Sequence, residues 1–113
     1  MESTRQKKLG RMIQKEMASI FQKESRKLFE GKMISVTVAH VSPDLGLAKI
    51  YISIFPETDK HEFLESIRNK SRILRNELAK RIRFQVKSIP ELAFFIDDSL
   101  DYIEHIEDIL KDK

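Results

Sequence analysis

Apolar residues recur every three or four positions along the first quarter of the chain, which is the spacing of one face of an α-helix. The residues of this apolar stripe are Leu9, Met12, Ile13, Met17, Ile20, Phe21 and Leu28. We predict a helix from about Thr4 to Lys27, with the hydroxyl of Ser3 or Thr4 as its N-cap. Gly10 either weakens the first turns of this helix or lets another backbone approach closely. Gly31 marks the end of the pattern.

After Gly31 the spacing changes to strict alternation, which is typical of half-buried β-strands. Two alternating apolar rows flank the turn-forming segment Ser42–Gly46, namely Ile34, Val36 and Val38 before it and Ala48, Ile50, Ile52 and Ile54 after it. This pattern predicts a β-hairpin whose isoleucine-rich face is buried. Asp44 is expected to cap the turn with its side chain. Lys49 and Tyr51 are expected on the opposite face of the second strand.

A second helical stripe follows the hairpin and predicts one long helix from about Asp59 to Ile82. Its apolar face comprises Phe63, Leu64, Ile67, Ser71, Leu74, Leu78 and Ile82. Ser71 is the weak point of this stripe, because a serine hydroxyl can bond back to a carbonyl and bend a helix. Pro90 then favours an extended backbone, and Leu92–Ile96 reads as a short strand. A final helix is expected from about Leu100 to Leu110.

The order helix, strand, strand, helix, strand, helix predicts an α+β fold. The third strand should follow a crossover and join the hairpin in a mixed three-stranded sheet, with helices on one face and the other face partly open. A length of 113 residues is typical of a single domain, covering residues 1–113. The aromatic residues assigned to the core are Phe21, Phe55, Phe63, Phe94 and Phe95.

Charge is strongly segregated along the chain, although the formal net charge is only +3. Residues 68–88 carry eight basic residues and one acid, whereas residues 89–113 carry eight acids and two lysines. A surface this basic typically contacts phosphate. The candidate nucleic-acid-binding residues are Arg68, Lys70, Arg72, Arg75, Lys80, Arg81 and Arg83 in the central helix and Arg5, Lys7, Lys8 and Arg11 near the N-terminus.

Other function classes lack their chemistry. The chain has no cysteine and no apolar run of about 18 residues, so neither a thiolate metal site nor a membrane span is expected. The histidines have no metal-ligand spacing, and no glycine-rich phosphate loop is present. Helix capping explains the acidic cluster of Asp97, Asp98 and Asp101. We therefore expect a cytoplasmic protein that is not an enzyme and needs no cofactor or metal.

Several segments together resemble the ribosome-binding factor A family. They are QKEMASIFQKES (Gln14–Ser25), the hairpin segment Val38–Phe55, LRNELAKRI (Leu74–Ile82) and IPELAFFIDDSL (Ile89–Leu100). The resemblance implies a type II KH-like fold. It also implies a monomeric, non-catalytic factor that binds the immature small (30S) ribosomal subunit and its 16S rRNA. Such a factor assists rRNA folding and processing, often in the cold, and dissociates from the mature particle.

The chain departs from the family at its central helix. Relatives commonly kink this helix at an Ala-x-Gly sequence, whereas Lys70, Ser71 and Arg72 stand here, so a kink would depend on Ser71. Two other functions remain open. One is a general single-stranded RNA or DNA binder with a KH-like surface. The other is a protein-interaction domain that acts through the acidic C-terminal helix, whose outward residues would be Asp101, Glu104, Glu107 and Asp108.

Overall fold

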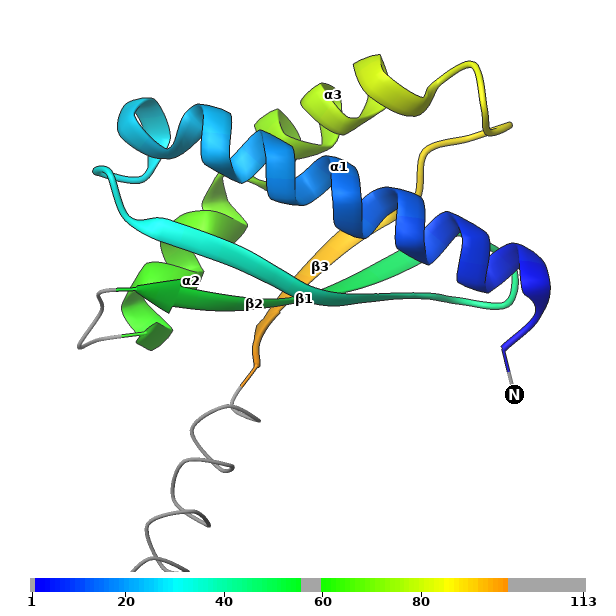
Figure 1. Cartoon of the computed structure of the whole chain (residues 1–113), viewed down its shortest axis with the longest axis horizontal. Coiled ribbons are helices and arrows are strands. Elements are labelled where there is room, and N and C mark those ends of the chain that lie inside the picture. The colour runs from blue at the N-terminus through cyan, green and yellow to red at the C-terminus, as the bar shows by residue number, and fades with distance from the viewer. Residues whose placement is uncertain (1, 56–59, 98–113) are drawn as a thin grey trace, which may run out of the picture.

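The computed structural model describes residues 2–55 and 60–97, which form a layer of helices against a three-stranded sheet (Figure 1). The elements follow the order α1 (Thr4–Leu28), β1 (Met33–Val41), β2 (Leu47–Phe55), α2 (Lys60–Asn69), α3 (Ser71–Ile82) and β3 (Glu91–Ile96). Strand β2 is central, antiparallel to β1 and parallel to β3. The predicted α+β, type II KH-like order and mixed sheet are confirmed. The expected N-cap Asp59 and the helix from Leu100 to Leu110 lie outside the described residues.

The core lies between the helices and one face of the sheet. Ala48, Ile50 and Ile52 of β2 are completely buried, as their alternation predicted. From α1, Phe21 packs against the ring of Phe94 in β3, with 6.1 Å between the ring centroids. Within the described ranges, the helices are all too short or too polar to cross a membrane. The sheet and helices therefore share one apolar layer.

Strand β1 contains an irregularity that the sequence pattern did not reveal. The pairing register with β2 shifts between Val36 and Val38, as in a β-bulge. An extra residue reverses the alternation of the side chains that follow it. Val38 therefore pairs with Tyr51 and leaves the buried row, whereas Ala39 and Val41 are buried. The prediction that Val38 shares the buried row of Ile34 was wrong.

Two of the five aromatic residues assigned to the core lie outside it. Phe55 is 68% exposed. Phe95 follows the buried Phe94, and successive strand residues point to opposite faces of a sheet. Its ring stacks on Tyr51 at a centroid distance of 5.4 Å, on the open face where Tyr51 was expected. Every residue of Leu92–Ile96 is apolar, so periodicity could not show whether Phe94 or Phe95 faces the core.

The predicted long helix is broken in two at Lys70. The Lys70 backbone leaves helical geometry, with φ −102° and ψ 11°, and its N–H bonds the carbonyl of Ile67 three residues earlier. Its ammonium donates to the Ser66 hydroxyl at 3.0 Å and lies 5.6 Å from the centroid of the Phe29 ring. Ser71, the predicted weak point, is the first residue of α3. The break therefore precedes Ser71 by one residue, and the basic residues are divided between two helices.

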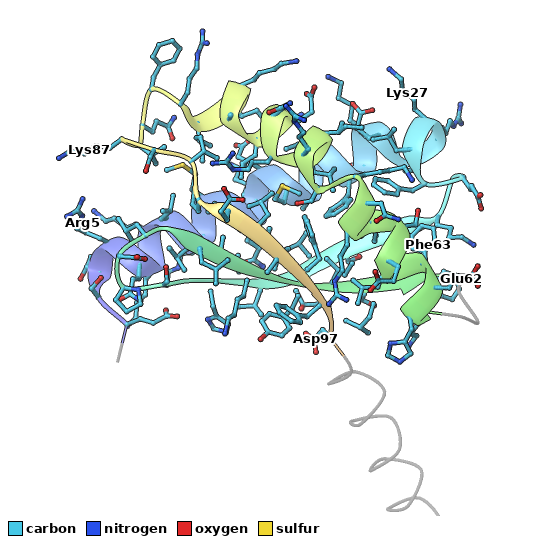
Figure 2. The ribbon with its side chains drawn as sticks, turned by 180° about the vertical axis from the view of Figure 1, so that it is seen from behind. Arg5, Lys27, Glu62, Phe63, Lys87 and Asp97 are labelled. Atoms are coloured by element: carbon cyan, nitrogen blue, oxygen red, sulfur yellow. The ribbon has the colours of Figure 1, made fainter. Side chains whose placement is uncertain are left out.

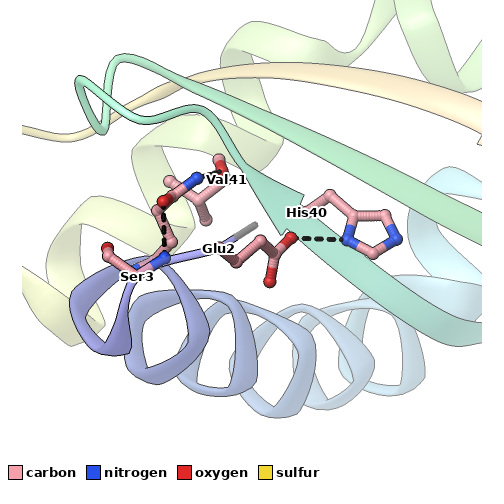
Figure 3. Close-up of polar contacts among 5 residues, drawn as sticks. Glu2, Ser3, His40 and Val41 are labelled. Carbon is pink, nitrogen blue, oxygen red and sulfur yellow. Dashed lines mark hydrogen bonds and ion pairs between the residues drawn. The ribbon is translucent and has the colours of Figure 1, made fainter.

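The start of α1 is fixed against the end of β1 (Figure 3). Ser3 caps the helix, because its hydroxyl accepts from the Gln6 amide and the Gln6 side chain accepts from the Ser3 amide. The Gln6 amide nitrogen Nε2 also donates to the Val41 carbonyl at 2.9 Å. A Cβ atom on Gly10 would lie 2.6 Å from the carbonyl oxygen of Ala39. The predicted cap at Ser3 and the close backbone approach at Gly10 are confirmed.

We expect Gly10→Ala to lower the free energy of unfolding, although alanine is the better helix former. The gain in helix propensity is about 1 kcal/mol, whereas a shift of α1 away from β1 costs about 3 kcal/mol, leaving a net loss of roughly 2 kcal/mol. Urea unfolding followed by circular dichroism measures the change. Gln22→Ala, at an exposed site of the same helix, should change stability by less than about 0.5 kcal/mol. A Gly10→Ala protein as stable as the parent would contradict the close approach.

The hairpin turn is held by its own side chains. The Asp44 carboxylate accepts from the Ser42 hydroxyl at 2.7 Å and from the Gly46 amide at 2.9 Å. These two hydrogen bonds hold the pKa of the Asp44 carboxyl below its usual value. The bond from the Ser42 hydroxyl is the larger cause, and the bond from the Gly46 amide is the smaller one. Leu45 adopts a left-handed backbone with φ 62°. The predicted cap by Asp44 is confirmed, and the turn is a defined wall for the groove described below.

Candidate nucleic-acid interface

Two of the predicted RNA-binding arginines donate hydrogen bonds to backbone carbonyls of β3 or of the residues just before it, although both side chains stay partly exposed. Nε and Nη2 of Arg68 donate to the Phe94 carbonyl at 3.2 and 2.8 Å. Nε of Arg75 donates to the Pro90 carbonyl at 3.0 Å, and its Nη2 donates to the Ile89 carbonyl at 2.7 Å. Strand β3 is an edge strand of the described sheet, so such carbonyls need other donors. Arg68 therefore attaches α2 to the edge of β3, and Arg75 attaches α3 to the two residues that lead into β3.

Lys70 and Arg81 are also engaged within the protein. Lys70 lies at the helix break, as described above. Nη1 of Arg81 donates to the Glu16 carboxylate at 3.2 Å and to the Ser19 hydroxyl at 2.9 Å. The Arg81 side chain is only 26% exposed. It therefore ties α3 to α1 rather than extending toward a ligand.

The remaining predicted basic residues, Arg72 and Lys80 in α3 and Arg83 directly after it, are exposed. Arg72 is exposed, and within the described ranges its side chain forms no hydrogen bond or ion pair. Lys80 pairs with Glu77 at 3.2 Å, yet its side chain is 70% exposed. The Arg83 guanidinium lies 4.6 Å from the centroid of the Phe84 ring, which is itself 88% exposed. Arg72, Lys80 and Arg83 are therefore accessible to phosphate.

The predicted N-terminal cations are all on exposed positions of α1, and two of them border a groove. Arg5, Lys7, Lys8 and Arg11 are exposed. Arg5 and Lys8 line a groove of about 640 Å³ between the start of α1, the hairpin turn and the connection between α3 and β3. Lys87 lines the same groove from that connection, and Figure 2 shows Arg5 and Lys87 at the same end of the molecule.

Lys87 was not among the predicted site residues. It was counted in the basic stretch, but residues 83–89 have no helical or alternating pattern that could place its side chain. Its place in the basic stretch 68–88 was the one feature of the sequence that could have indicated it as a site residue. The fold brings it to the start of α1, which is distant in sequence. The groove is thus a site that only the folded chain assembles.

The groove carries uncompensated positive charge. Three cations line it, and Asp44 is its acidic residue. The Asp44 carboxylate is already bonded within the turn. In the part of the chain that the structure describes, the side chains of Arg5, Lys8 and Lys87 form neither hydrogen bonds nor ion pairs. Clustered cations of this kind create a local positive potential that attracts phosphate.

The chain is thus a small KH-like α+β protein with exposed cations on α1, on α3 and in the connection before β3. Residues 5–110 match the family model described as Ribosome-binding factor A. A Ribosome-binding factor A from Cytophaga hutchinsonii is 51% identical over 110 residues, which cover 97% of this chain and 83% of the relative. The chain belongs to the ribosome-binding factor A family.

Solved structures of this family share the fold. The crystal structure of ribosome-binding factor A from Thermus thermophilus aligns with a TM-score of 0.66 at 23% identity, covering 80% of this chain and 94% of that one. A Thermus thermophilus homology model fitted into a cryo-electron microscopy map of a 30S complex aligns with a TM-score of 0.63 at 23% identity. That alignment covers 79% of this chain and 91% of the other.

Proposed function

We propose that this chain is a non-catalytic assembly factor that binds the immature small ribosomal subunit through 16S rRNA. The observation that carries the proposal is the set of exposed cations, of which all but Lys80, paired with Glu77, form no hydrogen bond or ion pair within the described residues. The proposed contacts are Arg5, Lys7, Lys8 and Arg11 on α1, Arg72, Lys80 and Arg83 along α3, and Lys87 in the connection. The membership of the family, and the 30S complex of the Thermus relative, support the small subunit as the partner.

The proposed mechanism is conformational. Lysines and arginines that neutralise phosphates release counterions, so binding should weaken steeply as salt rises. A factor that favours one arrangement of the rRNA stabilises that arrangement in proportion to its differential affinity for it. The same difference releases the factor once the mature arrangement forms. The proposed factor acts as a monomer in the cytoplasm and assists rRNA folding and processing without a reaction of its own.

Arg68 and Arg75 have a different part in this proposal. Their guanidinium groups are bonded to backbone carbonyls of β3 or of the residues just before it, so contact with RNA would require them to exchange these bonds or share their remaining donors. We assign them to the support of the binding surface. Lys70 and Arg81 are assigned in the same way, because both are engaged within the protein.

Co-sedimentation with purified ribosomal particles tests the proposed function. The chain is mixed with free small subunits, free large subunits and whole ribosomes over a salt series. Retention on free small subunits, falling as salt rises, is the expected result. Equal retention on every particle would replace the proposal with general RNA binding. No retention at low salt would favour a protein partner, such as one that binds the acidic residues 98–113.

A further inference from the structure

We propose that the groove beside the start of α1 holds an unpaired base of single-stranded RNA, with the adjoining phosphates on Arg5, Lys8 and Lys87. This inference rests on the proposed function, since it names the RNA element that one part of the basic surface takes. The groove volume of about 640 Å³ lies within the range of clefts that hold small ligands, about 300–1,000 Å³. It can therefore hold a base with its sugar.

The interior of the groove is apolar. Leu9 is buried there, and Met12, Leu45 and Val86 are half-buried side chains that pack against the core. A nucleobase has two apolar faces. Neighbouring bases cover these faces in a duplex, whereas the faces are accessible in single-stranded loops and ends. An unpaired base placed on these side chains would remove apolar surface of both partners from water.

The rim of the groove is suited to the backbone of the same nucleotide. Arg5 and Lys8 come from the start of α1, and Lys87 comes from the connection between α3 and β3. Figure 2 shows Arg5 and Lys87 at the same end of the molecule. Asp44 repels phosphate from the turn wall, so the backbone should lie along the three cations. An apolar floor under a cationic rim matches a nucleotide, whereas an apolar peptide segment would leave the cations without partners.

The walls of the groove are held in place before any ligand binds. Gln6 bonds the Val41 carbonyl, and Gly10 allows α1 to lie against β1. Across the turn, the Ser42 amide donates to the Leu47 carbonyl at 2.8 Å, and the Leu47 amide donates to the Ser42 hydroxyl at 3.0 Å. Preformed walls lower the conformational entropy lost on binding.

The residues just before the groove offer a surface for a neighbouring base. Phe84 immediately precedes Gln85 and Val86, which line the groove, and its ring is 88% exposed. Arg83 lies over that ring, so an aromatic and a guanidinium plane stand together beside the groove. Bases of single-stranded RNA stack on such groups. The connection between α3 and β3 is thus suited to two successive unpaired bases.

A nuclear magnetic resonance titration of the full chain tests whether the groove holds a base. Two ligands of equal charge are compared, a single-stranded RNA tetranucleotide and a tetranucleotide backbone that lacks its bases. Signals of Arg5, Lys8 and Lys87 should shift with both ligands, whereas methyl signals of Met12 and Val86 should shift only with the bases present. The intact tetranucleotide should bind about tenfold more tightly, as expected for one stacked base.

A matched pair of variants locates the base. Val86→Gln should remove the tenfold contribution of the base in the groove, keep any contribution of a base on Phe84, and leave affinity for the abasic backbone unchanged. Val38→Gln alters a half-buried valine on the open face of the sheet and should change neither affinity. Equal affinities for both ligands, with no methyl shift specific to the bases, would overturn the inference but leave the proposed function intact. The proposed function has its own test, and it fails if the chain is not retained on small subunits in co-sedimentation.

Discussion

Charge reversal of Arg5, Lys8 and Lys87 to glutamate should weaken binding to the small ribosomal subunit by about a hundredfold or more at moderate salt. Each substitution removes one phosphate contact and places a carboxylate near the RNA backbone. The fold should be unaffected, because these side chains are exposed and form no bonds within the described residues. Equilibrium binding of a fluorescently labelled chain to purified small subunits gives the dissociation constants.

The control for this prediction is a variant with the same change in net charge. Arg26→Glu, Lys27→Glu and Lys49→Glu alter exposed cations at the far end of α1 and on the open face of the sheet. This control should weaken binding by less than about tenfold, through the general change of charge. Equal losses for the two triple variants would mean that net charge, and not the proposed surface, governs binding.

Arg68→Ala combined with Arg75→Ala should lower the free energy of unfolding by roughly 3 kcal/mol, since hydrogen bonds from charged groups contribute about 1.5–3 kcal/mol each before exposure reduces them. The two arginines supply donors to the carbonyls of Phe94, Ile89 and Pro90. Without the two guanidinium groups, these carbonyl oxygens can accept hydrogen bonds only from water. Urea unfolding measures the loss.

The matched double variant changes two exposed arginines, one in α3 and one directly after it. Arg72→Ala with Arg83→Ala should cost less than about 1 kcal/mol of stability, as surface substitutions do. It should instead weaken binding to the small subunit. The opposite result, with a stable Arg68/Arg75 variant that no longer binds, would return those two arginines to the RNA-binding surface.

The sequence predicted the elements because each buries a regular stripe. Where a local irregularity interrupts that regularity, periodicity gave a wrong result. A single extra residue moved Val38 to the open face, and the break at Lys70 divided a continuous apolar stripe into two helices. The bulge leaves no trace in the apolar spacing. The break was anticipated one residue away, at Ser71, from the chemistry of the serine hydroxyl and not from periodicity. Phe95 shows the same limit, because a short strand of apolar residues does not reveal which side faces the core.

The sequence showed which segments are basic, but it did not show which of their side chains bond other parts of the protein and which stay accessible. Helical spacing shows that Arg72 and Arg75 both lie off the buried stripe, and it cannot distinguish them. The difference arises because the residues leading into β3 return beside α3, where the carbonyls of Ile89 and Pro90 accept from Arg75 and not from Arg72. Lys87 is the reverse case, since an irregular connection brings it to the groove beside Arg5. Both facts depend on tertiary contacts between distant segments.

The salt dependence of small-subunit binding tests most directly which cations contact RNA. The logarithm of the binding constant is plotted against the logarithm of salt concentration for the parent chain, Lys87→Gln and Arg75→Gln. Loss of one phosphate contact reduces the slope by about 0.7–0.9, so we predict that reduction for Lys87→Gln and an unchanged slope for Arg75→Gln. A reduced slope for Arg75→Gln together with an unchanged slope for Lys87→Gln would contradict the account.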